Sequence, residues 1–130
     1  MNNSCIAYIG LPDEEKYWLE QLSQGLASYG PIKAATETGV EQLDQMGCLI
    51  RLVLVDSGCV TNVMDLVSRI RGKFPNVKIL VVSASPVWKE VRKVIYAGAD
   101  DYCQKTLDGN GILEHVEGLI GKTQKREGNK

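Results

Sequence analysis

The chain has 130 residues, which fits one domain with a buried core, because folding at this size removes roughly two-thirds of the unfolded chain's surface from water. Its formal net charge of −1 and its pI near 5.8 argue against a general binder of nucleic acids or membrane surfaces. No apolar run reaches the length that spans a bilayer, and the first residues do not resemble a signal peptide. We therefore expect a cytoplasmic protein.

The cysteines and the sole histidine argue against a metal-binding protein and against an enzyme with a catalytic triad. Cys5, Cys48, Cys59 and Cys103 lack the spacing of a metal site, and three of them lie in or beside apolar runs. We therefore expect reduced thiols, as in a cytosolic protein, with Cys59 the most exposed. His115 lies within a helical pattern, which argues against a histidine metal site or a catalytic triad.

The first apolar run, residues 5–9, predicts a short buried strand. Pro12 suits the first turn of the helix that follows, because its missing N–H needs no partner there. Asp13, Glu14 and Glu15 would then lie at the positive end of the helix dipole. The apolar face of this predicted helix consists of Trp18, Leu19, Leu22 and Leu26.

The next segment predicts a weak edge strand at 32–36 and a short helix that starts after Gly39 and stops at Gly47. Residues 52–55 are apolar without interruption, which is typical of a strand buried on both faces. Asp56 closes this run, and open α/β sheets bind ligands at the carboxyl ends of their central strands. The alternative is that Asp56 only caps the turn that follows.

The same alternation continues in the second half. A helix at 63–74 precedes a strand at 77–82. Ser85 and Pro86 form a suitable N-cap and first-turn pair for the next helix, and Gly98 ends it. The apolar face expected for that helix consists of Val87, Val91, Val94 and Ile95.

The last elements are a brief strand at 101–104 and a helix that starts at Asp108 or Asn110. Five strands, each followed by a helix, predict an α/β fold: a doubly wound parallel sheet of order 2-1-3-4-5 with helices on both faces. We expect this domain to span 1–121, with 122–130 as a polar tail or the start of a linker.

Three polar residues follow neighbouring strands and should share one rim of the sheet: Asp56, Ser83 and Lys105. A carboxylate that attacks a phosphoryl group needs mainly positioning and neutralisation of oxygen charge, which a lysine and a hydroxyl supply. Taken singly, Ser83 reads as a turn residue and Lys105 as a surface lysine. Only their joint placement favours a functional site.

The chain resembles the receiver domain of two-component response regulators over essentially its whole length. The resemblance rests on residues 53–56 (Val-Leu-Val-Asp), 81–84 (Val-Val-Ser-Ala) and, most specifically, 97–105 (Ala-Gly-Ala-Asp-Asp-Tyr-Cys-Gln-Lys). Residues 35–43 are also similar to that family's second strand and helix. The resemblance implies a flavodoxin-like fold.

The resemblance also implies roles for four residues. Asp56 would be the phosphoacceptor, Ser83 the switch hydroxyl and Lys105 the positive partner of the phosphoryl group. Tyr102 would change rotamer when Ser83 engages that group. The alternative for Tyr102 is a half-buried strand tyrosine without a switching role.

The chain departs from the family pattern in its metal site. Gly10 and Leu11 stand where the family has paired acids that hold a divalent cation. We therefore expect magnesium to bind weakly, through Asp56, or not at all. Asp13 or Glu14 could replace the missing ligands, although the helix-dipole role is the favoured one.

Two further departures lie beside the other site residues. The loop at 57–62 is shorter than the family's. Thr106 replaces the proline that usually follows the lysine, so we expect an ordinary trans peptide there.

Two functions stay open, and the first is the one that we expect, because the chain retains Asp56, Ser83, Tyr102 and Lys105. In the first, a phosphorelay receiver accepts a phosphoryl group on Asp56 and alters the face formed by the family's fourth helix, fifth strand and fifth helix. In the second, a pseudo-receiver serves as a protein-interaction module that is not phosphorylated. A flavodoxin-like small-ligand binder or enzyme ranks last, because the chain has no glycine-rich phosphate loop. Catalysis would amount at most to phosphoryl acceptance and self-dephosphorylation.

The implied partners are a histidine kinase or phosphotransfer protein, an output domain or partner protein, and a second copy through the fourth to fifth helices. Neither a nucleic acid nor a membrane is expected. Trp88, Arg92 and Tyr96 should be exposed on the partner face, since they flank the apolar stripe. The alternative for Trp88 is that it covers the edge of the core.

Overall fold

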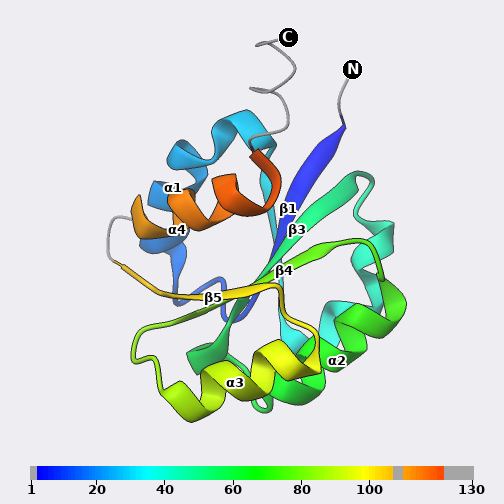
Figure 1. The fold of residues 1–130 in the computed structure, drawn as a ribbon. Coiled ribbons are helices and arrows are strands. Elements are labelled where there is room, and N and C mark those ends of the chain that lie inside the picture. Colours follow the sequence, from blue (N-terminus) through cyan, green and yellow to red (C-terminus); the bar gives the residue numbers. More distant parts are fainter. Residues whose placement is uncertain (1–2, 107–109, 122–130) are drawn as a thin grey trace, which may run out of the picture.

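The computed structural model describes residues 3–106 and 110–121, which form one parallel sheet between two layers of helices (Figure 1). The sheet has five strands in the order β2-β1-β3-β4-β5. This is the order predicted from the alternation of strands and helices. The strands are β1 (Ser4–Ile9), β2 (Ile32–Ala35), β3 (Leu49–Asp56), β4 (Lys78–Ser83) and β5 (Asp101–Gln104).

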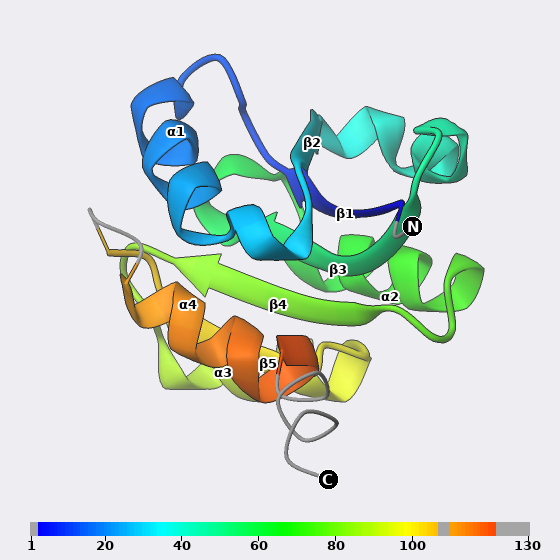
Figure 2. The ribbon, with the colours of Figure 1, turned by 90° about the horizontal axis from the view of Figure 1, so that it is seen from above.

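One layer contains α1 (Lys16–Gly25) and α4 (Asn110–Val116), and the other contains α2 (Val63–Lys73) and α3 (Trp88–Ala97). Figure 2 shows β1, β3 and β4 side by side between these layers. The segment predicted as the second helix is a 3-10 helix, η2 (Glu37–Gln45), so α3 and α4 correspond to the fourth and fifth helices of a receiver domain. The remaining helical turns are η1 (Ala27–Tyr29), η3 (Ser57–Cys59) and η4 (Glu117–Gly121).

The core has two halves because successive residues of a strand point to opposite faces of the sheet. In β1, Ile6 and Tyr8 pack with α1 and α4, whereas Ala7 and Ile9 pack with η2, α2 and α3. Residues 52–55 of β3 are completely buried, as their uninterrupted apolar run predicts.

The predicted start of the first helix is wrong. The N–H groups of Glu14 and Glu15 both donate to the carbonyl of Leu11, which closes a turn, and α1 begins only at Lys16. Asp13 and Glu14 are exposed in that turn, and the first turn of α1 contains no acid. Of the three predicted dipole acids, Glu15 stands at the N-cap of α1, whereas Asp13 and Glu14 precede the helix.

The N-cap predicted for α3 is also wrong. The N–H of Ser85 donates to the Ser83 hydroxyl over 3.2 Å, and Val87 stands at the N-cap position without a side-chain cap. The predicted apolar face is only half correct. Val94 is fully buried, but Val87 and Ile95 are 55% and 43% exposed. One side of α3 therefore presents more apolar surface to solvent than its pattern predicts.

The segment most similar to receiver domains has a structural role of its own. Gly98 ends α3 with a φ of 132°, and a Cβ there would lie 3.0 Å from the side chain of Arg71. Arg71 donates to the carbonyls of Gly98 and Val77 and to Asp100 Oδ2, and this carboxylate also accepts the N–H of Ile79. These bonds attach the end of α3 to the start of β4.

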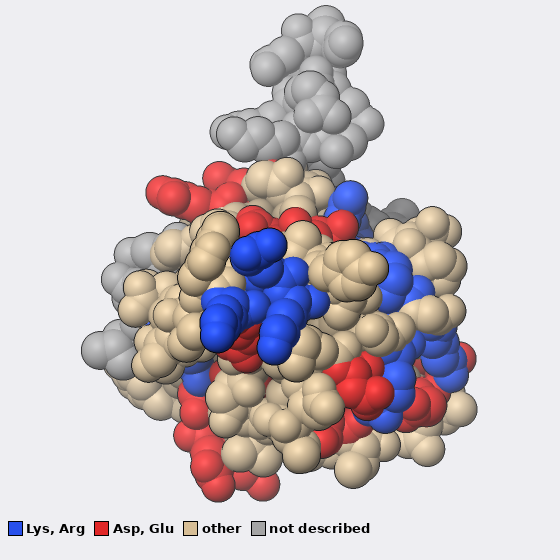
Figure 3. Space-filling view, turned by 60° about the horizontal axis from the view of Figure 1, so that its bottom comes forward, with Lys and Arg blue, Asp and Glu red and all other residues tan. Residues whose placement is uncertain are grey.

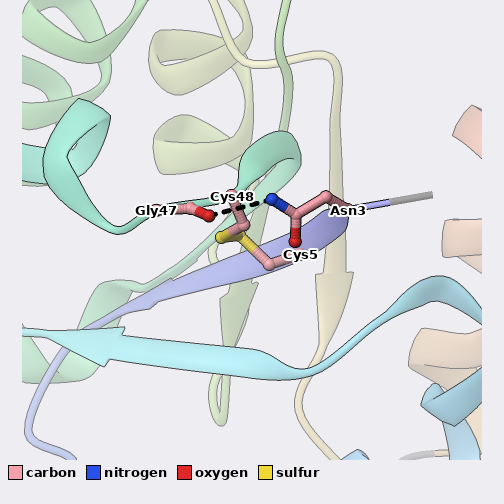
Figure 4. The surroundings of a disulfide bond; sticks show 4 residues. All are labelled: Asn3, Cys5, Gly47 and Cys48. Carbon is pink, nitrogen blue, oxygen red and sulfur yellow. Dashed lines mark hydrogen bonds between the residues drawn. A yellow bond between two sulfur atoms is a disulfide. The ribbon is translucent and has the colours of Figure 1, made fainter. Parts of the chain in front are cut away.

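The prediction of four reduced thiols is wrong for one pair. Cys5 and Cys48 form a disulfide between the start of β1 and the residue before β3 (Figure 4). Parallel pairing of β1 with β3, in which Cys5 lies opposite Ile50, brings together residues 43 positions apart. Cys59 and Cys103 are free, and burial raises the pKa of the Cys103 thiol to about 12.

At the end of the domain, α4 begins at Asn110, one of the two predicted starts. The other, Asp108, and the predicted tail at 122–130 lie outside the described residues. In the part of the chain that is described, no helix has the length and apolar character needed to cross a bilayer.

Candidate functional site

Asp56 ends β3 at the carboxyl rim of the sheet and is only 2% exposed. Lys105 follows β5, where its backbone N–H donates to the carbonyl of Ser83 over 2.8 Å. Its side chain turns inward, and Nζ lies 2.7 Å from Asp56 Oδ2. Two of the three rim residues singled out in the sequence are therefore in direct contact.

The Lys105 ammonium has three partners among the residues that the structure describes. Besides Asp56, Nζ lies 2.6 Å from Glu15 Oε1 and 4.6 Å from the centre of the Trp18 ring. Trp18 is itself held by a 2.7 Å hydrogen bond from its indole nitrogen to the carbonyl of Thr106. The ammonium thus lies between two carboxylates and against an aromatic face.

These contacts determine the charge of Lys105. Burial alone would lower the pKa of Lys105, but hydrogen bonds to Asp56 and Glu15 outweigh it, and the pKa lies above its ordinary value. Lys105 is therefore a permanent cation inside the site at neutral pH.

Tyr8 supplies a second donor to Asp56. Its ring is completely buried, and its hydroxyl donates to Asp56 Oδ2 over 2.8 Å. Burial, followed by this hydrogen bond, raises the pKa of Tyr8 well above its ordinary value, so the phenol stays neutral. A Cβ added at Gly10 would clash with the Tyr8 hydroxyl and would lie 2.7 Å from the ring carbon that bears it. The tyrosine therefore occupies the space of any side chain at position 10.

Ser83 and Tyr102 lie on the α3 side of the rim and have other partners. The Ser83 hydroxyl accepts the N–H of Ser85. Tyr102 is 9% exposed, and its hydroxyl donates to Glu90 Oε1 of α3 over 2.6 Å. Burial, then this bond to Glu90, raises the pKa of Tyr102, while the hydroxyls of Ser83 and Ser57 lower it.

One group of side chains in the described structure brings three ligand atoms close enough for a metal ion: Glu15, Asp56 and Cys59, all within 4.8 Å of one another. The thiol of this group is a poor ligand for magnesium. Mg²⁺ takes oxygen ligands, whereas the third donor here is a thiol whose pKa is raised by burial and by Asp56. The Lys105 ammonium also already bonds to both carboxylates.

Sequence reasoning missed three residues of this site. Tyr8 lies inside an apolar run and reads as core, and Trp18 reads as part of the apolar face of a helix. Glu15 reads as a helix-dipole acid beside Asp13 and Glu14. No local pattern distinguishes Glu15 from its two neighbours, because its role depends on where α1 begins.

The expected trans peptide at Thr106 is confirmed, since the described residues contain no cis bond.

No family model and no curated protein matches the chain. Solved structures do. A CheY-like receiver domain protein from Methanospirillum hungatei superposes with a TM-score of 0.71 and 19% identity, covering 95% of this chain and 98% of that one. An orphan response regulator of H. pylori gives a TM-score of 0.68 and 23% identity, with 92% and 99% covered.

A third structure is titled an atypical orphan response regulator with a phosphorylation-independent regulatory mechanism. It superposes with a TM-score of 0.67 and 24% identity, covering 89% of this chain and 94% of that chain. The strand order and these superpositions define the class: the chain has the flavodoxin-like fold of response-regulator receiver domains.

Proposed function

We propose that the chain is a receiver-fold signalling module that works through protein interaction, without metal-dependent phosphoryl transfer. One observation carries the proposal. Tyr8 fills the space at Gly10 where a receiver's metal-binding acid would stand, and it donates to the very carboxylate that would accept the phosphoryl group. This is the pseudo-receiver function that the sequence leaves open.

The chemistry of transfer explains why this arrangement disfavours phosphorylation. Phosphoryl transfer depends on positioning and on neutralising the charge of the transferred oxygens, which a bridging metal ion does best. Here Asp56 Oδ2 already accepts hydrogen bonds from Tyr8 and Lys105. Lys105 also pairs with Glu15, so its positive charge is already partly compensated before any phosphoryl group arrives.

The inward position of Tyr102 supports the same function. In a switching receiver, this aromatic would turn inward when a phosphoryl group engages Ser83. In this chain Tyr102 is already buried and bonded to Glu90 of α3 in the unmodified state. The α3 face would therefore keep one arrangement whether or not a kinase is present.

A second candidate function is phosphoryl acceptance on Asp56, and the 2.7 Å contact between Lys105 and Asp56 favours it. An Asp56 oxygen would attack the phosphorus of a phosphohistidine, forming an acyl phosphate as the P–N bond to the histidine breaks. Lys105 and Ser83 would then stabilise the phosphoryl oxygens. The partners would be a histidine kinase or phosphotransfer protein, with an output domain or a second copy downstream.

Intact-mass spectrometry after incubation with acetyl phosphate and magnesium separates the two functions. We expect no added phosphoryl mass on the wild-type chain. A mass gain that disappears in Asp56→Asn would overturn the main proposal and establish the second.

A designed variant tests whether Tyr8 is what prevents metal binding and phosphorylation. Gly10→Asp with Leu11→Asp restores the acids, and Tyr8→Leu makes room for them. We expect the triple variant to bind magnesium and accept phosphate, while the double variant with Tyr8 retained does neither. Circular dichroism identifies any variant that has lost its fold. If both folded variants respond alike, Tyr8 is not the obstacle.

A further inference from the structure

A shallow groove of about 900 Å³ lies between α2 and α3, on the opposite side of the sheet from α1 and α4. Met64 and Ser68 line it from α2. Lys89, Arg92, Lys93 and Tyr96 line it from α3. The groove therefore combines an adaptable apolar side chain, three cations and an aromatic ring.

The three cations of the groove have no ion-pair partner among the described residues. The nearby acids are engaged elsewhere: Glu90 accepts from Tyr102, and Asp65 pairs with Arg69. Figure 3 brings the side of α3 forward and shows Lys and Arg side chains gathered there. A local positive field thus remains on a chain whose net charge is −1.

Two large aromatic side chains on α3 add to this surface. Trp88 is 71% exposed and Tyr96 is 95% exposed, so neither covers the core. At about 100° per residue, Trp88, Arg92 and Tyr96 form one stripe, and Lys89 and Lys93 form the stripe beside it. Trp, Tyr and Arg are the residue types that contribute most to binding when a partner buries them.

We propose that this groove binds an acidic amphipathic helix of a partner protein. The inference rests on the proposed interaction-module function and names the kind of partner. Apolar side chains of the incoming helix would contact Met64 and Tyr96, and Trp88 would close over its edge. Carboxylates spaced one helical turn apart would meet Lys89 and Lys93, which are themselves one turn apart.

A single-stranded nucleic acid is the competing occupant, because exposed aromatics stack bases and cations bind phosphates. Three cations allow about three phosphate contacts, which supply little affinity at physiological salt. The acidic net charge of the chain opposes a polyanion further. A short acidic helix needs only the local cluster and is therefore favoured.

The test uses a synthetic helical peptide of about 20 residues with leucines on one face and glutamates beside them. Fluorescence titration reports on Trp88, because Trp18 is buried. We expect saturable binding, and binding about tenfold weaker for the same peptide with glutamine in place of glutamate. A single-stranded oligouridylate of matched charge should not compete.

Charge-reversal variants locate the site. Arg92→Glu with Lys93→Glu should weaken peptide binding about tenfold or more, since they remove the central cations. Lys16→Glu with Lys33→Glu changes the net charge equally at exposed positions away from the groove and should leave binding within about twofold.

Four results would overturn the inference: no binding of the acidic peptide, equal binding of the glutamine peptide, equal loss in both double variants, or stronger binding of the oligouridylate. Asp56 is unchanged in every variant, so its phosphorylation can be measured by intact-mass spectrometry independently of peptide binding. Peptide binding by a chain that also takes up phosphate would refute the proposed function and leave this inference standing.

Discussion

The rim of the sheet and the outer face of α3 both contain lysine, but they use its charge in opposite ways. At the rim, Lys105 lies between Asp56 and Glu15 and against the ring of Trp18. On α3, Lys89 and Lys93 point to solvent with no ion-pair partner among the described residues.

The difference shows which region has positive charge available to bind a ligand. At the rim the Lys105 ammonium is already shared between two carboxylates, because a buried carboxylate is tolerated only when it is paired and hydrogen-bonded. On α3 the charges stay hydrated at little cost, and binding free energy becomes available when a partner displaces that water. The predictions below test this contrast in order of decreasing effect.

Lys105→Ala should cost the most, because it leaves the carboxylate of Asp56 buried without its cation. We expect the free energy of unfolding, measured by urea denaturation, to fall by about 3 to 5 kcal/mol. Lys93→Ala is the matched control on α3 and should change it by less than about 0.5 kcal/mol. Similar losses in the two variants would contradict the contrast.

The disulfide provides a reference far from both regions. Cys48→Ser opens a covalent loop of 43 residues and should lower the free energy of unfolding by about 3 kcal/mol. Cys59→Ser is the control and should have little effect. Thiol counting on the unfolded, unreduced chain should find two free cysteines, and a count of four would refute the disulfide.

Tyr8→Phe removes one donor from Asp56 and keeps the ring that fills the space at Gly10. We expect a loss of about 1.5 to 3 kcal/mol in the free energy of unfolding, because the bond is to a charged group. Tyr96→Phe removes the same hydroxyl from a residue that is 95% exposed and should be neutral. Equal effects would mean that the Tyr8 bond adds no stability.

The last prediction, with the smallest effect, concerns the change of stability at alkaline pH. Tyr8 and Lys105 both have a raised pKa in the folded state, so their contribution is complete below the unfolded values, near 10, and is lost as pH rises further. Burial also raises the pKa of the Cys59 and Cys103 thiols, whose unfolded values lie near 9, so the melting temperature should decline gently from about pH 9 and more steeply above about pH 10.

A variant identifies the groups responsible for that fall. Combining Tyr8→Phe with Lys105→Met removes both groups and should reduce the slope above about pH 10, while the contribution of Cys59, Tyr102 and Cys103 remains. An unchanged slope would assign the effect to other groups.

Several features of the fold could be predicted without coordinates. The uninterrupted apolar run at 52–55 indicates a central strand, and the alternation of strands with helical patterns leads to the observed strand order. Asp56 and Lys105 could be expected to meet, because the ends of parallel strands share one edge.

Other features depend on contacts between distant segments. Tyr8 of β1 reaches Asp56 of β3, 48 positions further along the chain, and this contact fixes its ring in the space at Gly10. Cys5 and Cys48 are brought together only by the register of β1 on β3. The exposure of apolar residues on α3 depends on how this helix packs against the sheet, which buries Val94 but not Ile95.

The sequence by itself determined the α/β architecture and the residues that end the strands, because periodicity and turn chemistry act over a few neighbouring positions. Only the tertiary structure decided that Tyr8 and Glu15 join Asp56 and Lys105 at the rim, that two cysteines are joined, and that one face of α3 is left charged and open. Each of these depends on the three-dimensional distance between segments far apart in the chain, and no local pattern encodes that distance.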